Sequence, residues 1–249
     1  MELIIEIKNL VKVFYSRGRK ITAVDDISFD VFKGEIFGMI GPNGAGKSTT
    51  FSMMTTLLKP TGGSIKVAGF DVEKEDNKIR PLVGIVPQKL SLYPLLTARE
   101  NMEFMGNLYG VPKKEMEEKV DYYLKLVGLE TSADRYVGGF SGGMKQRLSV
   151  IAAVIHDPEI LFWDEPSTGL DPQTRQAIWK LAKKFNSEGK TLIFTTHYME
   201  EADNLCDRVA VMNLGKIVAL DDPETLKKNT GGTNLEEVFI RFTGEEVRD

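Results

Sequence analysis

Residues 41–48 read Gly-Pro-Asn-Gly-Ala-Gly-Lys-Ser and fit the pattern G-x-x-x-x-G-K-[ST]. An apolar run, 35–40, precedes them and an apolar-patterned stretch, 49–58, follows, which predicts a loop between a strand and a helix. Glycines let the backbone curl around an anion, so that N–H groups of the loop and of the helix start converge on phosphate oxygens. In this pattern Lys47 reaches the β- and γ-phosphates and Ser48 binds Mg²⁺. The residues that we expect to contact a nucleotide here are Asn43, Gly44, Ala45, Gly46, Lys47, Ser48 and Thr49.

The overall composition limits the classes to which the chain can belong. It has 249 residues, 42% of them hydrophobic, and a formal net charge of −4. This is enough apolar material for one large α/β core with a smaller lobe, while interspersed charges of both signs disfavour nucleic-acid binding. The single cysteine, Cys206, excludes an internal disulfide. Because no run of 18 apolar residues and no signal-peptide pattern occurs, we expect a soluble, cytoplasmic chain.

Short β-rich runs predict the strands of an α/β fold. Several of these runs are continuously apolar, as strands buried on both faces are, and helical patterns lie between them. We therefore expect a mainly parallel sheet with helices on its faces, preceded by antiparallel strands at the N-terminus. The predicted strands are 3–7, 27–31, 36–40, 65–67, 83–86, 160–163, 192–195, 209–212 and 217–220.

A purely helical segment, 97–129, interrupts the α/β pattern. Thr97 and Glu100 have the spacing of a capping box, and Pro112 can begin a second helix that Gly128 ends. Stripes of methionine and tyrosine along these helices indicate the core of a lobe rather than a ligand site. We predict a core of residues 1–87 and 157–220, an inserted α-helical subdomain of residues 88–156, and a C-terminal helical extension of residues 221–249.

Two acids follow the apolar run 160–163. Asp164 and Glu165 would emerge at the carboxyl end of a strand, where open α/β sheets bind ligands. Asp164 could hold Mg²⁺ through water, and Glu165, turned the other way by strand alternation, could orient or deprotonate an attacking water. The alternative is a solvated acidic turn before Pro166, but the phosphate-binding pattern upstream favours the metal site.

Three further signals are weak when each is taken alone. Ser141, Gly142 and Gly143 open another helix, where they could bind an anion or merely cap the helix and provide a hinge. His197 follows the strand 192–195, and a single histidine there is more often structural than catalytic. Gln88 follows the strand 83–86 and Pro87, just before the helical segment begins.

The order of these pieces along the chain resembles that of the ATP-binding-cassette ATPases. The resemblance covers nearly the whole chain, and its discriminating motif is the Ser-Gly-Gly element at 141–143, which in that family is called the signature. It implies a P-loop NTPase (RecA-like) core with antiparallel N-terminal strands and an inserted helical subdomain. In this family residues 41–48 form the Walker A loop, and Asp164 and Glu165 end the Walker B strand.

The resemblance also implies roles that the residues alone left open. Gln88 corresponds to the Q-loop glutamine, a catalytic residue that also belongs to the metal site, and His197 to the switch histidine, a catalytic residue that contacts the γ-phosphate. Asp171, in Gly-Leu-Asp at 169–171, corresponds to the D-loop and is expected among the nucleotide-binding residues. Phe14 falls where the family stacks an aromatic ring on adenine, with Tyr15 as the alternative.

Members of the family form head-to-tail dimers in which the signature of one subunit covers the γ-phosphate held by the Walker A loop of the other. The implied cofactors are therefore ATP and Mg²⁺, and the implied partner is a second copy or a related cassette. Phe140 and Met144 flank the signature where leucine and glutamine are commonest, and Trp163 replaces an aliphatic residue. None of these departures removes a phosphate donor, so we expect intact sites.

The resemblance finally implies the ATPase subunit of a membrane transporter. Its permease subunits would be separate chains that dock near Gln88 to Leu96, holding this chain at the cytoplasmic face of the membrane. The tail around 235–239 resembles that of drug exporters, which points to export. The alternative is a soluble cassette ATPase of iron–sulfur cluster assembly, which shares every ATP motif. No nucleic-acid partner is expected.

Overall fold

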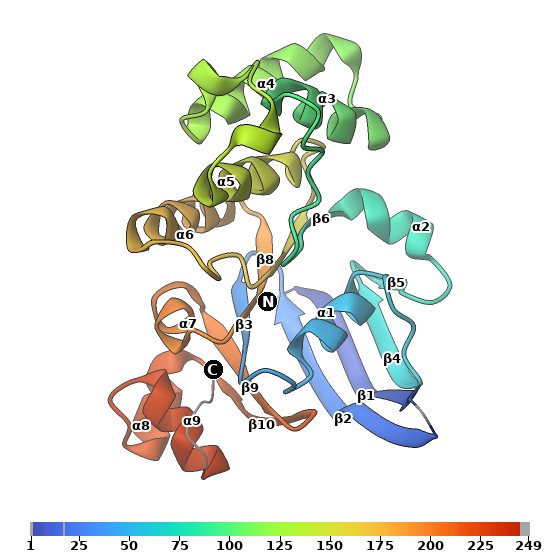
Figure 1. Cartoon of the computed structure of the whole chain (residues 1–249). Coiled ribbons are helices and arrows are strands. Elements are labelled where there is room, and N and C mark those ends of the chain that lie inside the picture. The colour runs from blue at the N-terminus through green and yellow to red at the C-terminus, as the bar shows by residue number, and fades with distance from the viewer. Residues whose placement is uncertain (1, 17, 245–249) are drawn as a thin grey trace.

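The computed structural model describes residues 2–16 and 18–244 and is built on two β-sheets (Figure 1). The larger sheet has the order β10-β9-β3-β8-β7-β6. All its neighbouring strands are parallel except the β10–β9 pair at one edge, so the prediction of a mainly parallel sheet is confirmed. Its strands, in sheet order, are β10 (Lys216–Asp221), β9 (Arg208–Asn213), β3 (Ile36–Ile40), β8 (Thr191–Thr196), β7 (Ile160–Asp164) and β6 (Val83–Val86).

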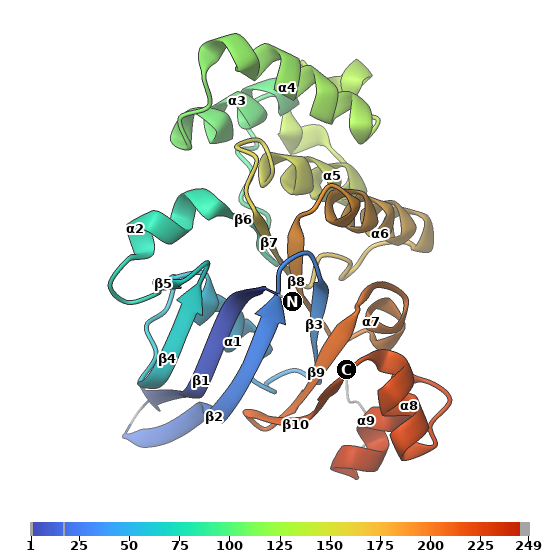
Figure 2. The same cartoon turned by 180° about the vertical axis from the view of Figure 1, so that it is seen from behind.

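The smaller sheet is antiparallel and has the order β2-β1-β4-β5, as Figure 2 shows from behind. Its first two strands are much longer than the runs 3–7 and 27–31 that the apolar pattern predicted. The outer halves of both strands are largely exposed, so they carry no apolar alternation that could reveal them. The strands of this sheet are β2 (Arg19–Phe32), β1 (Leu3–Ser16), β4 (Gly62–Val67) and β5 (Phe70–Asp71).

Hydrophobic cores lie on both faces of the larger sheet. Alternate residues of β7 enter different cores: Phe162 faces the smaller sheet and Trp163 faces the helices on the other side. Trp163 is fully buried and contacts the rings of Phe185 and Phe194 at centroid distances of 6.5 and 6.1 Å. Burial on both faces explains why these strands read as continuous apolar runs.

The helical segment 97–129 and the helix that follows it at 142–152 form a lobe above the sheets, at the top of Figure 1. Its helices are α3 (Ala98–Leu108), α4 (Lys113–Leu126) and α5 (Gly142–Ala152). The predicted capping box is present, because Thr97 and Glu100 exchange hydrogen bonds with each other's backbone N–H. His156 stacks on Tyr109, the C-cap of α3, at a centroid distance of 3.7 Å and donates to Val83 O, which ties the end of α3 to β6. Burial lowers the pKa of His156 to about 4, so this ring is neutral at pH 7.

The remaining helices cover the sheets or form the C-terminal end. The helix predicted to span 49–58 ends earlier, because Thr55 caps it and Thr56 takes a left-handed φ of 62°. The C-terminal extension contains two helices, while 245–249 of the predicted extension lie outside the described residues. Within the described part of the chain, no helix is long and apolar enough to cross a membrane. These helices are α1 (Lys47–Met54), α2 (Asp76–Ile79), α6 (Pro172–Ser187), α7 (Met199–Leu205), α8 (Pro223–Thr230) and α9 (Leu235–Thr243).

Candidate active site

Four adjacent parallel strands bring the separate motifs of the sequence to one edge of the sheet. β3 leads into residues 41–48, here called the phosphate loop, and β8, next to it, leads to His197. β7 ends at Asp164 and Glu165, and β6 leads to Gln88. Because the carboxyl ends of parallel strands meet at one edge, residues far apart in the sequence converge there.

The phosphate loop needs glycine where it passes close to other backbone segments. Gly41 has a φ of 150°, and a Cβ there would lie 2.2 Å from Met212 O; Gly46 has a φ of 104°, and a Cβ would lie 2.6 Å from Ala23 O. The loop leads directly into α1, whose N-cap, Gly46, makes no side-chain capping bond. The N–H groups of the first turn of α1 therefore have no side-chain cap to compete with an anion.

A cleft of about 400 Å³ lies against this loop. It is lined by residues 43–49, by 21–23 of β2 and by Glu165. All seven residues from 43 to 49 that the sequence predicted to contact a nucleotide therefore line one cleft. Sequence reasoning missed the β2 wall, because its exposed residues belong to no motif.

The two candidate adenine-stacking aromatics lie at the far end of β1. Phe14 pairs with Ile21, which lines the cleft, so both side chains are on the same face of the sheet. Tyr15 is the next residue and lies on the opposite face. Phe14 is 39% exposed and Tyr15 78% exposed. The register favours Phe14 over Tyr15.

Lys47 provides a buried positive charge at the base of the cleft. Its Nζ donates to Gly41 O at 2.7 Å and to Pro42 O at 3.1 Å, and it lies 3.7 Å from Glu165 Oε1. Burial lowers the pKa of Lys47, and the nearby carboxylates of Glu165 and Asp164 oppose that shift. The ammonium group is thus held between its own loop and the acid pair.

The carboxylate of Glu165 is where the three predicted catalytic side chains meet. Gln88 Nε2 donates to Glu165 Oε2 at 3.0 Å, and His197 Nδ1 lies 3.3 Å from the same oxygen. Glu165 adopts a left-handed φ of 47°, uncommon for a residue with a side chain. Its N–H donates to both the carbonyl and the hydroxyl oxygen of Thr195, at 3.0 Å each, which fixes this turn of the backbone.

Asp164 faces the start of α1 instead. Ser48 Oγ donates to Asp164 Oδ1 at 3.3 Å, and Thr195 Oγ1 donates to the same oxygen. Burial raises the pKa of Asp164, against the hydrogen bonds from Thr195 and Ser48. This oxygen-only pair suits Mg²⁺, which keeps several waters and binds one or two carboxylates together with substrate phosphates. No cluster of three or more His, Cys, Asp or Glu side chains in the described residues could hold a metal, so a cation here would also need the phosphates of a nucleotide.

The signature, residues 141–143, begins α5 in the lobe. Ser141 is the N-cap and accepts a hydrogen bond from Met144 N at 3.2 Å, so the simple capping role is present. Its side chain is exposed, and among the described residues that line the cleft none belongs to the signature. A Cβ on Gly143 would lie 2.9 Å from Thr174, which donates to Asp171 at 2.6 Å. The signature and the predicted D-loop residue are therefore neighbours within one chain.

Two threonines that the sequence did not single out orient the acids. Thr195 bonds to both Asp164 and Glu165, and Thr168 Oγ1 donates to Glu165 Oε2 at 3.3 Å. Thr195 of β8 pairs with Asp164 of the neighbouring strand, so knowledge of the strand order would have revealed it. The fold and the site together define a P-loop nucleotide hydrolase with an inserted helical lobe.

Comparisons with known proteins identify the family. A sequence model of the family described as ABC transporter matches residues 24–168. The linearmycin resistance ATP-binding protein LnrL of Bacillus subtilis is 42% identical over 241 residues, covering 97% of this chain and 76% of that protein. The Nod factor export ATP-binding protein I of Paraburkholderia xenovorans is 41% identical over 228 residues, covering 92% and 75%. The probable multidrug ABC transporter ATP-binding protein YbhF of Escherichia coli is 39% identical over 246 residues, covering 97% and 42%.

Solved structures agree with this family. The dimeric, post-hydrolysis structure of the ATP-binding cassette MJ0796 bound to ADP and Pi has a TM-score of 0.81 and 29% identity, covering 88% of this chain and 98% of that one. The chain therefore belongs to the ABC transporter ATP-binding family, and it is an ABC-type ATPase. The predictions of its family, fold and enzymatic class are confirmed.

Proposed function

We propose that this chain is the ATP-hydrolysing subunit of an export complex and that it binds two ATP at a head-to-tail dimer interface. One observation carries the dimer: residues 43–48 of the phosphate loop line the cleft but, among the described residues, no part of the signature does, and its Ser141 and Gly142 are exposed on the lobe. A second copy can bring its Ser141, Gly142 and Gly143 to that cleft. A similar cassette, MJ0796, has a dimeric structure bound to ADP and Pi, which supports a dimer as the functional form.

Each side chain of the cleft has a chemical task in this proposal. Lys47 and the N–H groups of α1 bind the phosphates, and Phe14 stacks on adenine. Ser48, Asp164 and Gln88 would hold Mg²⁺, which would supply positive charge to neutralise the phosphates of the nucleotide. Glu165 accepts the proton of the attacking water, and His197 holds the γ-phosphate. Asp171 accepts a hydrogen bond from Thr174, which packs against Gly143, and in this way helps to position the signature of its own chain.

Hydrolysis would then control the association of the two subunits. A signature that contacts the γ-phosphate in trans makes closure depend on ATP, because the contact differs between the ATP-bound and ADP-bound states. Once the γ-phosphate is cleaved, this difference disappears and the dimer can open. The cycle of closing and opening is the movement that could drive an attached membrane protein.

The proposal of export rests on the relatives and on the tail. The named relatives belong to resistance, Nod factor export and multidrug systems, which disfavours the alternative role in iron–sulfur cluster assembly. The tail helix α9 corresponds to the segment 235–239 that resembled drug exporters. We place the chain at the cytoplasmic face of the membrane, bound to separate permease subunits.

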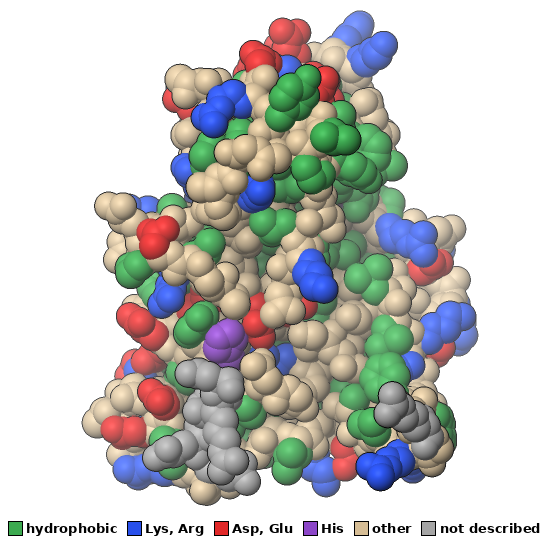
Figure 3. Space-filling view, viewed as in Figure 1, with side chains coloured by type: hydrophobic (Ala, Val, Ile, Leu, Met, Phe, Trp, Pro, Cys, Tyr) green, Lys and Arg blue, Asp and Glu red, His purple; other side chains and the backbone are tan. Residues whose placement is uncertain are grey.

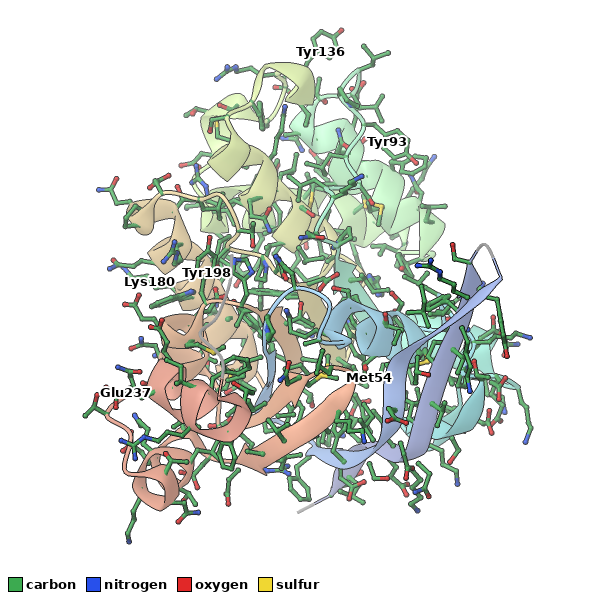
Figure 4. All side chains as sticks on the ribbon, turned by 60° about the horizontal axis from the view of Figure 1, so that its bottom comes forward. Met54, Tyr93, Tyr136, Lys180, Tyr198 and Glu237 are labelled. Atoms are coloured by element: carbon green, nitrogen blue, oxygen red, sulfur yellow. The ribbon has the colours of Figure 1, made fainter. Side chains whose placement is uncertain are left out.

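An exposed apolar patch on the lobe supports this docking. Residues 94–97 are bridged by backbone hydrogen bonds to 136–138, which brings Tyr93, Leu95 and Tyr136 to one exposed part of the lobe. Figure 4 shows Tyr93 and Tyr136 at the same end of the molecule, away from Met54, and Figure 3 shows hydrophobic side chains gathered over the lobe. Tyr93 follows Gln88 by five residues in the chain, so the segment 88–93 would connect a permease bound at the patch to the catalytic residues.

We expect the chain to co-purify with a membrane-spanning protein from native membranes, and Leu95→Arg to lose that partner. Leu95 is 87% exposed, so a charge there disturbs docking without disturbing the fold. The matched control is Leu57→Arg, at a leucine that is 69% exposed on the core. Equal recovery of the partner with both variants, or no membrane-spanning partner with the unaltered chain, would contradict the proposed coupling.

A further inference from the structure

A glutamate outside every motif is fully buried next to the site. Glu201 of α7 has 0% of its surface exposed. Its Oε1 accepts hydrogen bonds from Ser167 Oγ and, at 2.9 Å, from Trp179 Nε1. Its Oε2 has no hydrogen-bond partner among the residues that the structure describes. A buried carboxylate is costly unless its environment compensates it, so this position calls for a physical explanation.

Hydrogen-bond donors and one cation, Arg175 of α6, compensate the cost of burying the Glu201 carboxylate. Burial raises the pKa of Glu201, while the hydrogen bonds from Ser167 and Trp179, the nearby hydroxyl of Thr196 and the charge of Arg175 oppose the shift. The guanidinium of Arg175 lies 4.7 Å from the centroid of the Tyr198 ring. Tyr198 directly follows His197 in the chain. Glu201 is thus the acceptor at the centre of a network that joins α6, α7 and the segment after the acids.

That segment links two functional residues of the site. Ser167 lies between Glu165 and Asp171, so its bond to Glu201 anchors the segment near its middle. The next residue, Thr168, donates to the Glu165 carboxylate at 3.3 Å. Leu170 N donates to Ser167 O at 3.2 Å, which tightens the turn toward Asp171. Movement of Ser167 would therefore displace the groups on both sides of it.

We propose that Glu201 is a positioning residue for ATP hydrolysis. It fixes residues 165–171 against α7, so that Glu165 stays in place beside His197. It acts through Ser167 and Thr168, and it belongs to no part of the cleft lining. The inference rests on the catalytic role proposed for Glu165. It does not depend on which permease the complex contains.

The test is steady-state ATP hydrolysis by purified variants. Glu201→Leu leaves the Ser167 hydroxyl and the Trp179 N–H without an acceptor, so we expect kcat to fall roughly 10- to 100-fold, because small displacements of catalytic groups cost this much. KM and the affinity for ATP should change by less than about twofold, since the phosphate loop is untouched. Glu201→Gln keeps an acceptor oxygen and should recover kcat to within about threefold. The control is Glu200→Leu at the exposed neighbour, which should behave as the unaltered chain.

A second set of variants separates positioning from a general loss of stability. Ser167→Ala removes the link without creating a buried charge, and it should lower kcat in the same way; combined with Glu201→Leu it should add little, because both break one connection. Additive losses, a rise in KM in place of a fall in kcat, or a normal kcat in Ser167→Ala would overturn the proposal. Glu165→Gln is measured alongside, because normal hydrolysis by that variant would refute the proposed role of Glu165 itself.

Discussion

Replacement of Glu165 by glutamine is expected to lower the turnover of ATP by roughly 100- to 10,000-fold while ATP still binds, which is the range that loss of a general base produces. The amide has nearly the shape of the carboxylate and can still accept the hydrogen bonds from Gln88 and Thr168. It cannot take a proton from water. The phosphate loop is unchanged, so calorimetry with ATP and Mg²⁺ should give an affinity close to that of the unaltered chain.

The same variant should also accumulate as a dimer in the presence of ATP. Closure needs the γ-phosphate, and a chain that cannot cleave it has no route to the open state. Gel filtration with ATP and with ADP measures this directly, and Glu200→Gln is the control. If the Glu165→Gln variant hydrolyses ATP at a near-normal rate, the assignment of the base is wrong.

Replacement of Lys47 by alanine should have the largest effect on binding. Lys47 contributes a buried ammonium group directly at the cleft, and charge-assisted hydrogen bonds of this kind contribute about 1.5–3 kcal/mol each. We expect the affinity for ATP to fall roughly 10- to 100-fold or more, with hydrolysis lost at ordinary ATP concentrations.

The control for this variant is Lys66→Ala, at an exposed lysine of the antiparallel sheet. It removes the same charge from the chain and should leave ATP binding unchanged. Unaltered affinity in Lys47→Ala, measured by calorimetry, would mean that the loop does not hold the phosphates as proposed.

The sequence predicted the elements that carry strong local patterns. The phosphate loop, the apolar strands and the Thr97–Glu100 capping box each depend on residues close together in the chain, and the structure contains all of them. The convergence of Gln88, Glu165 and His197 needed more, because it follows from the order β3-β8-β7-β6 rather than from any local spacing.

Other features depend on tertiary contacts that leave no pattern in the sequence. The wall of the cleft at 21–23 lies on an exposed part of β2, and single polar residues such as Thr195 and Glu201 resemble ordinary interruptions of an apolar or helical stretch. The early end of α1 at Met54 depends on the backbone turn at Thr56, which the apolar residues up to Leu58 conceal. The proposed use of the signature in trans came only from the family resemblance.

The most direct test of the shared site mixes two inactive variants. Ser141→Arg blocks the signature but keeps the phosphate loop, whereas Lys47→Ala damages the phosphate loop but keeps the signature. In a mixed head-to-tail dimer, one of the two sites combines an intact loop with an intact signature. ATP hydrolysis should therefore reappear on mixing, in proportion to the mixed dimer formed, although each variant alone is inactive. Activity that stays absent in a mixture shown to contain mixed dimers would contradict a site built from two copies of the chain.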